Sequence, residues 1–211
     1  MKFNLPKLYA ITDARLSGLS HAEQVARLAE GGATLVQLRE KHASPREFYR
    51  EAEAALGVAR ARGVRLVIND RADIALALGA DGVHLGQDDL PPEAARRLLG
   101  DEFIIGYSTH DLAQVALAAR LGVDYVAFGP VFATRTKERP DPTVGLELLA
   151  RARAALPSSI PLVAIGGITR ETARAALDAG ADAVAVISAL VSAPGEIARR
   201  TREFLDEMGK K

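Results

Sequence analysis

The sequence predicts a single closed (β/α)8 barrel, the TIM barrel fold, over residues 1–211. Short apolar runs alternate with helical apolar patterns from residue 8 to residue 208, which is typical of buried parallel strands joined by helices. The alternation gives eight strand–helix units, whereas an open sheet usually has fewer strands and a switch point. A helix-ending glycine, two short residues and a strand recur at Gly32, Gly79, Gly122 and Gly180, a repeat that indicates fold rather than function.

The expected strands are short, apolar and bounded by turn residues, as in strands that are covered on both faces. They are 8–12, 35–39, 66–68, 83–85, 104–107, 125–128, 162–165 and 183–187. The expected helices each carry apolar residues at helical spacing. They are 21–29, 45–61, 72–78, 92–99, 111–121, 146–155, 170–177 and 195–208.

The composition bounds the class of protein. The chain has 211 residues, 48% apolar and 26% charged, which suits one globular domain. Its 27 basic residues equal its 27 acidic residues, which argues against general nucleic-acid binding. The absence of cysteine excludes disulfides and thiolate chemistry, and it fits a cytoplasmic protein. No signal-like or membrane-spanning apolar run is present, and the oligomeric state stays open, a homo-oligomer included.

Two aspartates follow neighbouring strands in the central part of the chain. Asp70 comes just after the third expected strand, and Asp89 follows the fourth. Because parallel neighbours place their carboxyl ends on one side of a sheet, we expect both carboxylates at the barrel mouth, where this fold places its chemistry. Two hard oxygen donors there predict a Mg²⁺ site for a phosphorylated ligand. The alternative is that each aspartate only caps the helix that follows it.

The second strand ends in polar residues of one parity, Gln37, Arg39 and Lys41, with apolar neighbours on the other parity. Side chains alternate along a strand, so we expect these three to point into the mouth; a surface salt-bridge ladder is the alternative. Gln37 and Asn69 supply amides that can read a nitrogen heterocycle through paired donor and acceptor hydrogen bonds.

Hydroxyl groups and cations follow the fifth and sixth strands. Ser108 is a candidate phosphate contact, although serine also caps helices. The connection after the sixth strand is the longest in the chain and carries Thr134, Thr136 and Lys137, which we interpret as anion ligands. Long connections in compact domains are usually functional, so we expect this one to close over a substrate; a solvated loop is the alternative.

Small residues follow the last two strands. Gly167 comes after the seventh strand, and Ile187 and Ser188 end the eighth. Glycine lets backbone amides approach a phosphate, and the loops after strands seven and eight are the usual phosphate site of this fold. The mouth is therefore expected to bind two anions, one here and one beside the metal.

Several motifs together resemble the thiamine phosphate synthase family, in order and in spacing, over nearly the whole chain. They are LYAITD (8–13), VQLREK (36–41), IND (68–70), HLGQDD (84–89), GPVF (129–132), TRTK (134–137) and AIGGI (164–168). The resemblance implies a (β/α)8 transferase of thiamine biosynthesis that uses Mg²⁺. It would join 4-amino-2-methyl-5-pyrimidinylmethyl diphosphate to 4-methyl-5-(2-phosphoethyl)thiazole, or to its carboxylated form, and release diphosphate.

The resemblance also assigns roles by position. Asp70 and Asp89 would hold Mg²⁺. The pyrimidine diphosphate would contact Arg39, Lys41, Asn69, Ser108 and Lys137, with Gln37 near the ring. The thiazole phosphate would contact Thr134, Thr136, Gly167, Ile187 and Ser188. The expected catalytic residues are Arg39, Lys41, Ser108 and Lys137. His84 and His110 receive no role, and we expect His84 to be a strand histidine with one hydrogen-bond partner.

Two other functions compete with the synthase. A thiazole tautomerase of the same superfamily would, by the resemblance, carry a histidine where this chain has Pro130, and proline has no acid–base group. A non-catalytic metabolite-binding regulator would need only the phosphate site at Gly167 and Ser188, because a fold alone does not determine function. The chemistry favours the synthase: expelling diphosphate needs charge neutralisation by a metal and cations rather than a nucleophilic side chain.

Overall fold

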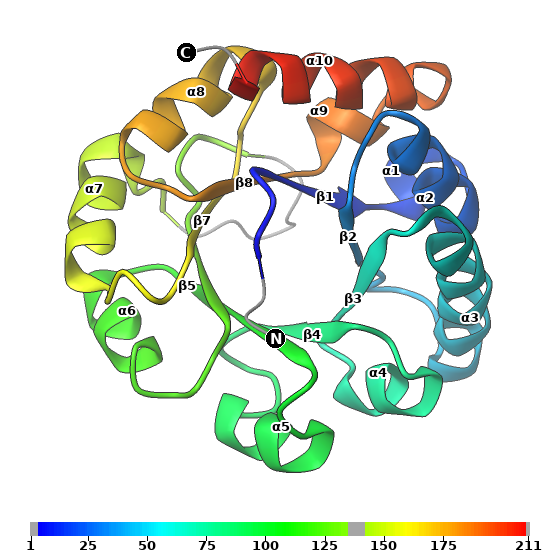
Figure 1. Ribbon diagram of the computed structural model, residues 1–211, viewed down its shortest axis with the longest axis horizontal. Coiled ribbons are helices and arrows are strands. Elements are labelled where there is room, and N and C mark those ends of the chain that lie inside the picture. The colour runs from blue at the N-terminus through cyan, green and yellow to red at the C-terminus, as the bar shows by residue number, and fades with distance from the viewer. Residues whose placement is uncertain (1–3, 135–141, 210–211) are drawn as a thin grey trace.

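The computed structural model describes residues 4–134 and 142–209. Within these residues eight parallel strands form a closed barrel in chain order, and β1 pairs with β8 to close it. The helices form a ring outside the strands, as Figure 1 shows. The (β/α)8 fold expected from the alternating pattern is confirmed.

The strands are β1 (Leu8–Thr12), β2 (Leu35–Leu38), β3 (Arg65–Asn69), β4 (Gly82–Leu85), β5 (Ile104–Thr109), β6 (Tyr125–Phe128), β7 (Leu162–Ile165) and β8 (Ala183–Val186). Four expected carboxyl ends are corrected. β3 runs one residue further, to Asn69, and β5 two residues further, to Thr109, so that Ser108 lies within β5. The other two strands end one residue earlier than expected. Arg39 lies outside β2 because the pairing with β1 stops at Leu38, and Ile187 lies outside β8 as the residue before a short helix. Both residues therefore belong to the loops at the mouth.

The expected helices are α2 (His21–Glu30), α3 (Pro45–Arg62), α4 (Ala72–Leu78), α5 (Pro92–Leu99), α6 (Leu112–Ala118), α7 (Gly145–Ala155), α8 (Arg170–Asp178) and α10 (Ile197–Gly209). The expected helix 111–121 is too long, because Asp111 caps α6 by accepting the Gln114 N–H at 2.8 Å. The structure also contains α1 (Ala14–Ser17), α9 (Ser188–Val191) and the 3-10 turn η1 (Pro194–Glu196). These segments are too short for a periodic pattern to reveal.

The strand side chains alternate between a layer under the helices and the barrel interior. The interior holds Tyr9, Ile11, Leu35, Val67, Ile104, Tyr125, Ala127, Val163, Ala183 and Ala185. It also encloses the polar side chains of Gln37 and His84, both buried. A Cβ on Gly106 would lie 2.0 Å from Cζ of Tyr125, so glycine at this position of β5 leaves the space that the Tyr125 ring occupies.

The glycine repeat explains how the amino-terminal ends of the strands are held. In three repeats the third residue is an aspartate whose carboxylate accepts a backbone N–H of the preceding strand: Asp81 from Leu66 at 2.7 Å, Asp124 from Ile105 at 2.8 Å and Asp182 from Leu162 at 2.8 Å. Arg96 donates to Asp124 at 2.7 Å, and Arg153 donates to Asp182 at 2.9 Å. The repeat is therefore structural, as its pattern indicates.

No helix in the described ranges is long and apolar enough to cross a membrane.

Candidate functional site

Asp70 and Asp89 lie together at the carboxyl end of the barrel, as expected from the ends of their strands. Burial raises the pKa of Asp70; the ammonium of Lys41 opposes this rise, and the adjoining carboxylate of Asp89 adds to it. The two acids are thus close enough to share a hydrogen bond and to repel each other when both are ionised. A cation between them would relieve that repulsion.

The capping alternative for these aspartates is wrong. The N-cap of α4 is Arg71 and the N-cap of α5 is Pro91. Asp70 instead adopts a left-handed backbone conformation with φ of 64°, which is uncommon for a residue other than glycine and is concentrated at functional sites. Asp89 accepts the Gly86 N–H at 2.6 Å, so its own loop orients its carboxylate.

The two cations that follow β2 each pair with an aspartate from another strand. Lys41 forms an ion pair with Asp70, and Nη1 of Arg39 lies 3.0 Å from Oδ2 of Asp13. The partners follow β3 and β1 rather than lying along β2, so these ion pairs cross between strand ends at the mouth. The binding roles of Arg39 and Lys41 stay predictions.

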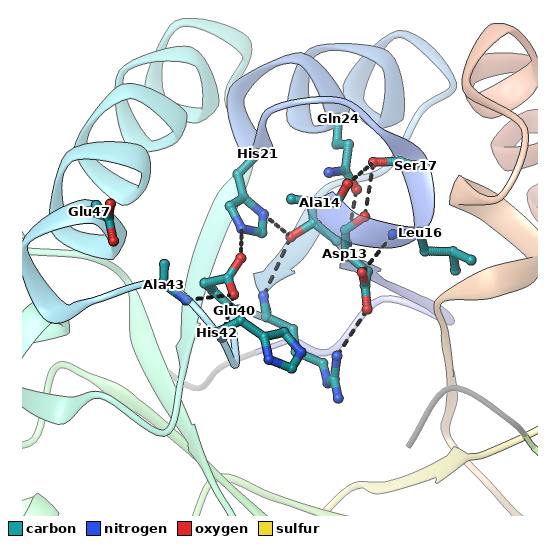
Figure 2. Close-up of polar contacts among 12 residues, drawn as sticks. Asp13, Ala14, Leu16, Ser17, His21, Gln24, Glu40, His42, Ala43 and Glu47 are labelled. Atoms are coloured by element: carbon teal, nitrogen blue, oxygen red, sulfur yellow. Dashed lines mark hydrogen bonds and ion pairs between the residues drawn. The ribbon is translucent and has the colours of Figure 1, made fainter. Parts of the chain in front are cut away.

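Figure 2 shows the polar cluster that supports the loop after β2. Asp13 directly follows β1 and caps α1 by accepting the Leu16 N–H at 2.9 Å, while its own N–H donates to Gln24 Oε1 at 3.0 Å. The carboxylate that pairs with Arg39 is therefore fixed by two elements. Asp13 is not among the residues expected from the sequence, although it directly follows β1 as Asp70 directly follows β3. The same signal, an acidic residue at a strand end, identifies both.

Glu40 and His21 complete this cluster. Glu40 accepts the N–H groups of His42 at 2.6 Å and Ala43 at 3.1 Å. Burial opposes ionisation of Glu40, but these backbone donors prevail and lower its pKa. His21 is fully buried, with Nδ1 at 2.7 Å from Thr12 Oγ1 and Nε2 at 3.6 Å from Glu40 Oε2, and burial lowers its pKa. In the sequence, neither Glu40 nor His21 lies in a pattern that distinguishes it from a surface residue, so the sequence alone did not indicate their roles in this cluster.

Asn69 places a buried amide beside the acids. Its side chain ends β3 and is 7% exposed, and its Nδ2 has no hydrogen-bond partner among residues 4–134 and 142–209. An unsatisfied buried donor costs about 1–3 kcal/mol, so such groups are rare and call for an explanation. An acceptor on a bound ligand would satisfy this donor.

A chain of hydrogen bonds crosses the barrel interior from β2 to β5. Gln37 Nε2 donates to Tyr9 OH at 2.9 Å, Tyr9 OH lies 2.8 Å from Tyr125 OH, and Tyr125 OH lies 2.9 Å from His84 Nδ1. His84 Nε2 lies 2.8 Å from Ser108 Oγ. The expectation of one partner for His84 is wrong, because both ring nitrogens meet hydroxyl groups. The N-cap alternative for Ser108 is also wrong, since Asp111 caps α6.

The loops after β7 and β8 lie next to each other because their strands pair. Gly167 has a φ of 65°, and a Cβ there would lie 2.4 Å from the Ala133 carbonyl oxygen. Ile187 precedes α9 and Ser188 is its first residue. The N–H groups of Leu190 and Val191 both donate to the Ile187 carbonyl oxygen at 3.0 Å, which leaves the N–H groups of Ser188 and Ala189 as the candidate phosphate donors of this short helix.

The loop after β6 is described up to Thr134. Thr136 and Lys137 lie outside the described residues, as does the rest of 135–141. His110 Nδ1 lies 2.7 Å from the Gly129 carbonyl oxygen, so this histidine holds the start of the loop. A Cβ on Gly166 would lie 2.4 Å from the Cβ of Pro130. Glycine at this position therefore allows the loops after β6 and β7 to pack in direct contact.

Comparisons with known proteins identify the family to which this barrel belongs. The family model described as thiamine monophosphate synthase matches residues 8–190. The chain is 49% identical over 208 residues to the thiamine-phosphate synthase of Koribacter versatilis, with 95% of each chain covered. It is 50% identical over 196 residues to that of Chlorobium luteolum, covering 92% of this chain and 90% of the relative.

The fold comparison gives the same result. The solved structure of thiamine phosphate pyrophosphorylase from Pyrococcus furiosus superposes with a TM-score of 0.85 at 38% identity, and the match covers 97% of both chains. A family model that spans most of the chain, relatives near 50% identity and this structural match lead to one conclusion. The chain belongs to the thiamine monophosphate synthase family.

Proposed function

We propose that the chain is a transferase that joins 4-amino-2-methyl-5-pyrimidinylmethyl diphosphate to 4-methyl-5-(2-phosphoethyl)thiazole, or to its carboxylated form. The thiazole nitrogen forms a bond to the methylene carbon, and the bond from that carbon to the diphosphate oxygen breaks with its electron pair leaving on diphosphate. The product is thiamine phosphate, for which the curated relatives are named. The observation that carries this proposal is the pair Asp70 and Asp89 beside Nδ2 of Asn69, which has no hydrogen-bond partner among the described residues.

Asp70 and Asp89 are the residues that would hold Mg²⁺. Magnesium is usually bound by one or two carboxylates, with water and substrate phosphates as the other ligands. The donor set fits this pattern: two adjoining acids, and no cluster of three or more His, Cys, Asp or Glu side chains in the described part of the chain. When bound, the ion would supply positive charge to the departing diphosphate.

The protein's own cations and hydroxyls stabilise the same charge. Arg39, Lys41, Ser108 and Lys137 bind the diphosphate, and their positive charge and hydrogen bonds grow in value as charge accumulates on the leaving group. Asp13 holds the guanidinium of Arg39 in place before substrate arrives. Gln37 and Asn69 orient the aminopyrimidine ring, whose electron density assists departure of diphosphate.

The second substrate occupies the side of the mouth that follows β6, β7 and β8. Its phosphate contacts Thr134, Thr136, Gly167, Ile187 and Ser188. Holding two substrates in a reactive geometry supplies a large part of the rate enhancement without any covalent enzyme intermediate. We further propose a cytoplasmic location, because both substrates are charged small molecules.

The tautomerase and the regulator are less well supported. Pro130 supplies no acid–base group in the loop after β6. A regulator bound through Gly167 and Ser188 has no use for two adjoining acids that repel each other at the far side of the mouth. Its ligand affinity would be unchanged by loss of Asp70 or Asp89.

A direct assay tests the proposal. Purified protein is mixed with the aminopyrimidine diphosphate, the thiazole phosphate and Mg²⁺, and thiamine phosphate is oxidised to fluorescent thiochrome. Product that disappears with EDTA and returns with excess Mg²⁺ is the expected result. Folded protein that gives no product, but converts the carboxylated thiazole to its tautomer, would overturn the synthase in favour of the tautomerase.

A further inference from the structure

We propose that Tyr125 is a positioning residue. Its hydroxyl determines which partner donates at each link of the hydrogen-bond chain that runs from Gln37 to Ser108 across the barrel interior, and we call this the direction of the chain. That direction turns the Gln37 carbonyl oxygen toward the pyrimidine ring and makes the Ser108 hydroxyl a donor toward the diphosphate. The inference rests on the proposed function and deepens it, because it assigns a residue that selects a 4-amino over a 4-oxo pyrimidine.

The direction follows from counting protons along the chain. The amide Nε2 of Gln37 donates to Tyr9 OH, so the single hydroxyl proton of Tyr9 goes to its other partner, Tyr125 OH. The Tyr125 hydroxyl accepts from Tyr9, so it donates its own single proton to Nδ1 of His84. A neutral imidazole that accepts at Nδ1 carries its proton on Nε2, and that proton goes to Ser108 Oγ.

The two ends of the chain then match the proposed substrate. With one Nε2 proton donated to Tyr9 and the orientation of the amide thereby fixed, Gln37 has its Oε1 available as an acceptor that fits the exocyclic amino group of the ring. Ser108 already accepts from His84, so its own proton is available to an anionic oxygen. The opposite direction would present an amide donor to the amino group and serine lone pairs to the diphosphate, and both contacts would be repulsive.

Burial keeps this chain intact. Tyr9 is 1% exposed, Tyr125 is 0% exposed and His84 is 5% exposed, so water does not replace their partners. Burial raises the pKa of both tyrosines, and the hydrogen bonds that Tyr9 shares with Gln37 and Tyr125 oppose the rise at Tyr9. Both phenols therefore keep the protons on which the direction depends.

Packing fixes the position of the central hydroxyl. The rings of His84 and Tyr125 stack with an interplanar angle of 18°, and the ring of Tyr9 meets Tyr125 edge-on at 88°, each pair with centroids 5.6 Å apart. The absence of a side chain at Gly106 makes room for the phenol. These contacts hold the Tyr125 phenol where its hydroxyl reaches both Tyr9 and His84.

The first test measures the free protein and does not depend on turnover. Nitrogen NMR of His84 in the parent should show a neutral ring with the proton on Nε2 and with Nδ1 accepting. Tyr125→Phe should lose the Nδ1 hydrogen bond and mix the two tautomers, whereas Tyr9→Phe should keep the tautomer, since Tyr125 can still donate. Tyr49→Phe, on the helix layer, is the matched control and should change nothing.

The second test measures binding of two ligands without a leaving group, the 4-amino and 4-oxo forms of the pyrimidinylmethyl monophosphate, by calorimetry. Tyr9→Phe and Tyr125→Phe should each reduce the preference for the amino form by about tenfold, the worth of one hydrogen bond. Tyr49→Phe should keep the parental preference.

Two results would overturn the inference. One is a parental His84 with its proton on Nδ1; the other is an unchanged preference in both Tyr9→Phe and Tyr125→Phe. Failure of the proposed function is distinguishable, because it would appear as absence of thiamine phosphate in the parent whatever the NMR result.

Discussion

Carboxylates occur at both ends of the barrel and serve opposite purposes. At the amino-terminal end, Asp124 and Asp182 each accept a strand N–H and pair with an arginine. At the carboxyl end, Asp70 and Asp89 adjoin each other, and the pKa of Asp70 is raised by burial and by Asp89 despite Lys41. At the amino-terminal end the carboxylates are neutralised by arginines and hold the strands together. At the carboxyl end two carboxylates repel each other and are available to bind a ligand. The neighbours of an aspartate therefore determine whether it stabilises the fold or serves the site.

The largest expected effect is on turnover at the mouth. Asp89→Ala should lower kcat by about 10²–10³-fold, the usual cost of removing one group that stabilises transition-state charge. The fold should persist, because Asp89 lies in a loop after β4 and outside the barrel hydrogen bonding. Thiochrome kinetics with circular dichroism checks both points. Equal kcat in the variant and the parent would refute the contrast between the two ends.

The next effect is on stability at the opposite end. Asp124→Asn should lower the free energy of unfolding by about 1–3 kcal/mol, since the Ile105 N–H and Arg96 lose a charged acceptor. Urea unfolding followed by circular dichroism measures this. The kcat of the folded variant should equal that of the parent, and a lower kcat at unchanged stability would contradict the structural role.

Asp13→Asn separates the two purposes in one residue. Asparagine caps helices as well as aspartate does, so α1 should persist, and loss of the ion pair with Arg39 should lower the free energy of unfolding by no more than about 1 kcal/mol. Arg39 loses its ionic partner, and the KM for the pyrimidine diphosphate should rise by about tenfold, equivalent to about 1.4 kcal/mol. Initial-rate kinetics with each substrate varied in turn is the measurement. A matching rise in the thiazole KM would count against the assignment of Arg39 to the diphosphate.

The smallest expected effect is a gain in stability at the mouth. Without Mg²⁺, Asp70→Asn should raise the free energy of unfolding at neutral pH, by less than Asp124→Asn lowers it. Burial and the Asp89 carboxylate raise the folded-state pKa of Asp70 above that of the unfolded chain, so the parent loses stability as the pH rises through that folded-state pKa. The variant lacks this loss, and asparagine tolerates the left-handed backbone.

Unfolding in urea with EDTA, at neutral pH and at a pH below the ordinary aspartate value, measures the effect. The gain should disappear at the lower pH, where Asp70 is protonated in both states. A loss of stability at neutral pH as large as that of Asp124→Asn would show that Asp70 holds the fold, as Asp124 does.

Much of the mouth could be predicted because it follows from where strands end. Gln37, Asn69 and Asp70 lie at or next to the ends of β2 and β3, and a strand period of two assigns their faces. Asp13 obeys the same rule at the end of β1, so a residue outside the expected set was also predictable from the sequence. His21 and Glu40 follow no such rule, since one lies on a helix and the other in a loop.

By itself the sequence determined the barrel, the order of its strands and the set of residues at its mouth, because apolar periodicity and strand ends are local properties. Only the tertiary structure decided the partners: Asp70 with Asp89 and Lys41, Arg39 with Asp13, and the chain from Gln37 to Ser108. The link between Tyr9 and Tyr125 joins residues 116 positions apart. Barrel closure and the space at Gly106 bring them within 2.8 Å, and no local pattern encodes a contact that depends on curvature and packing.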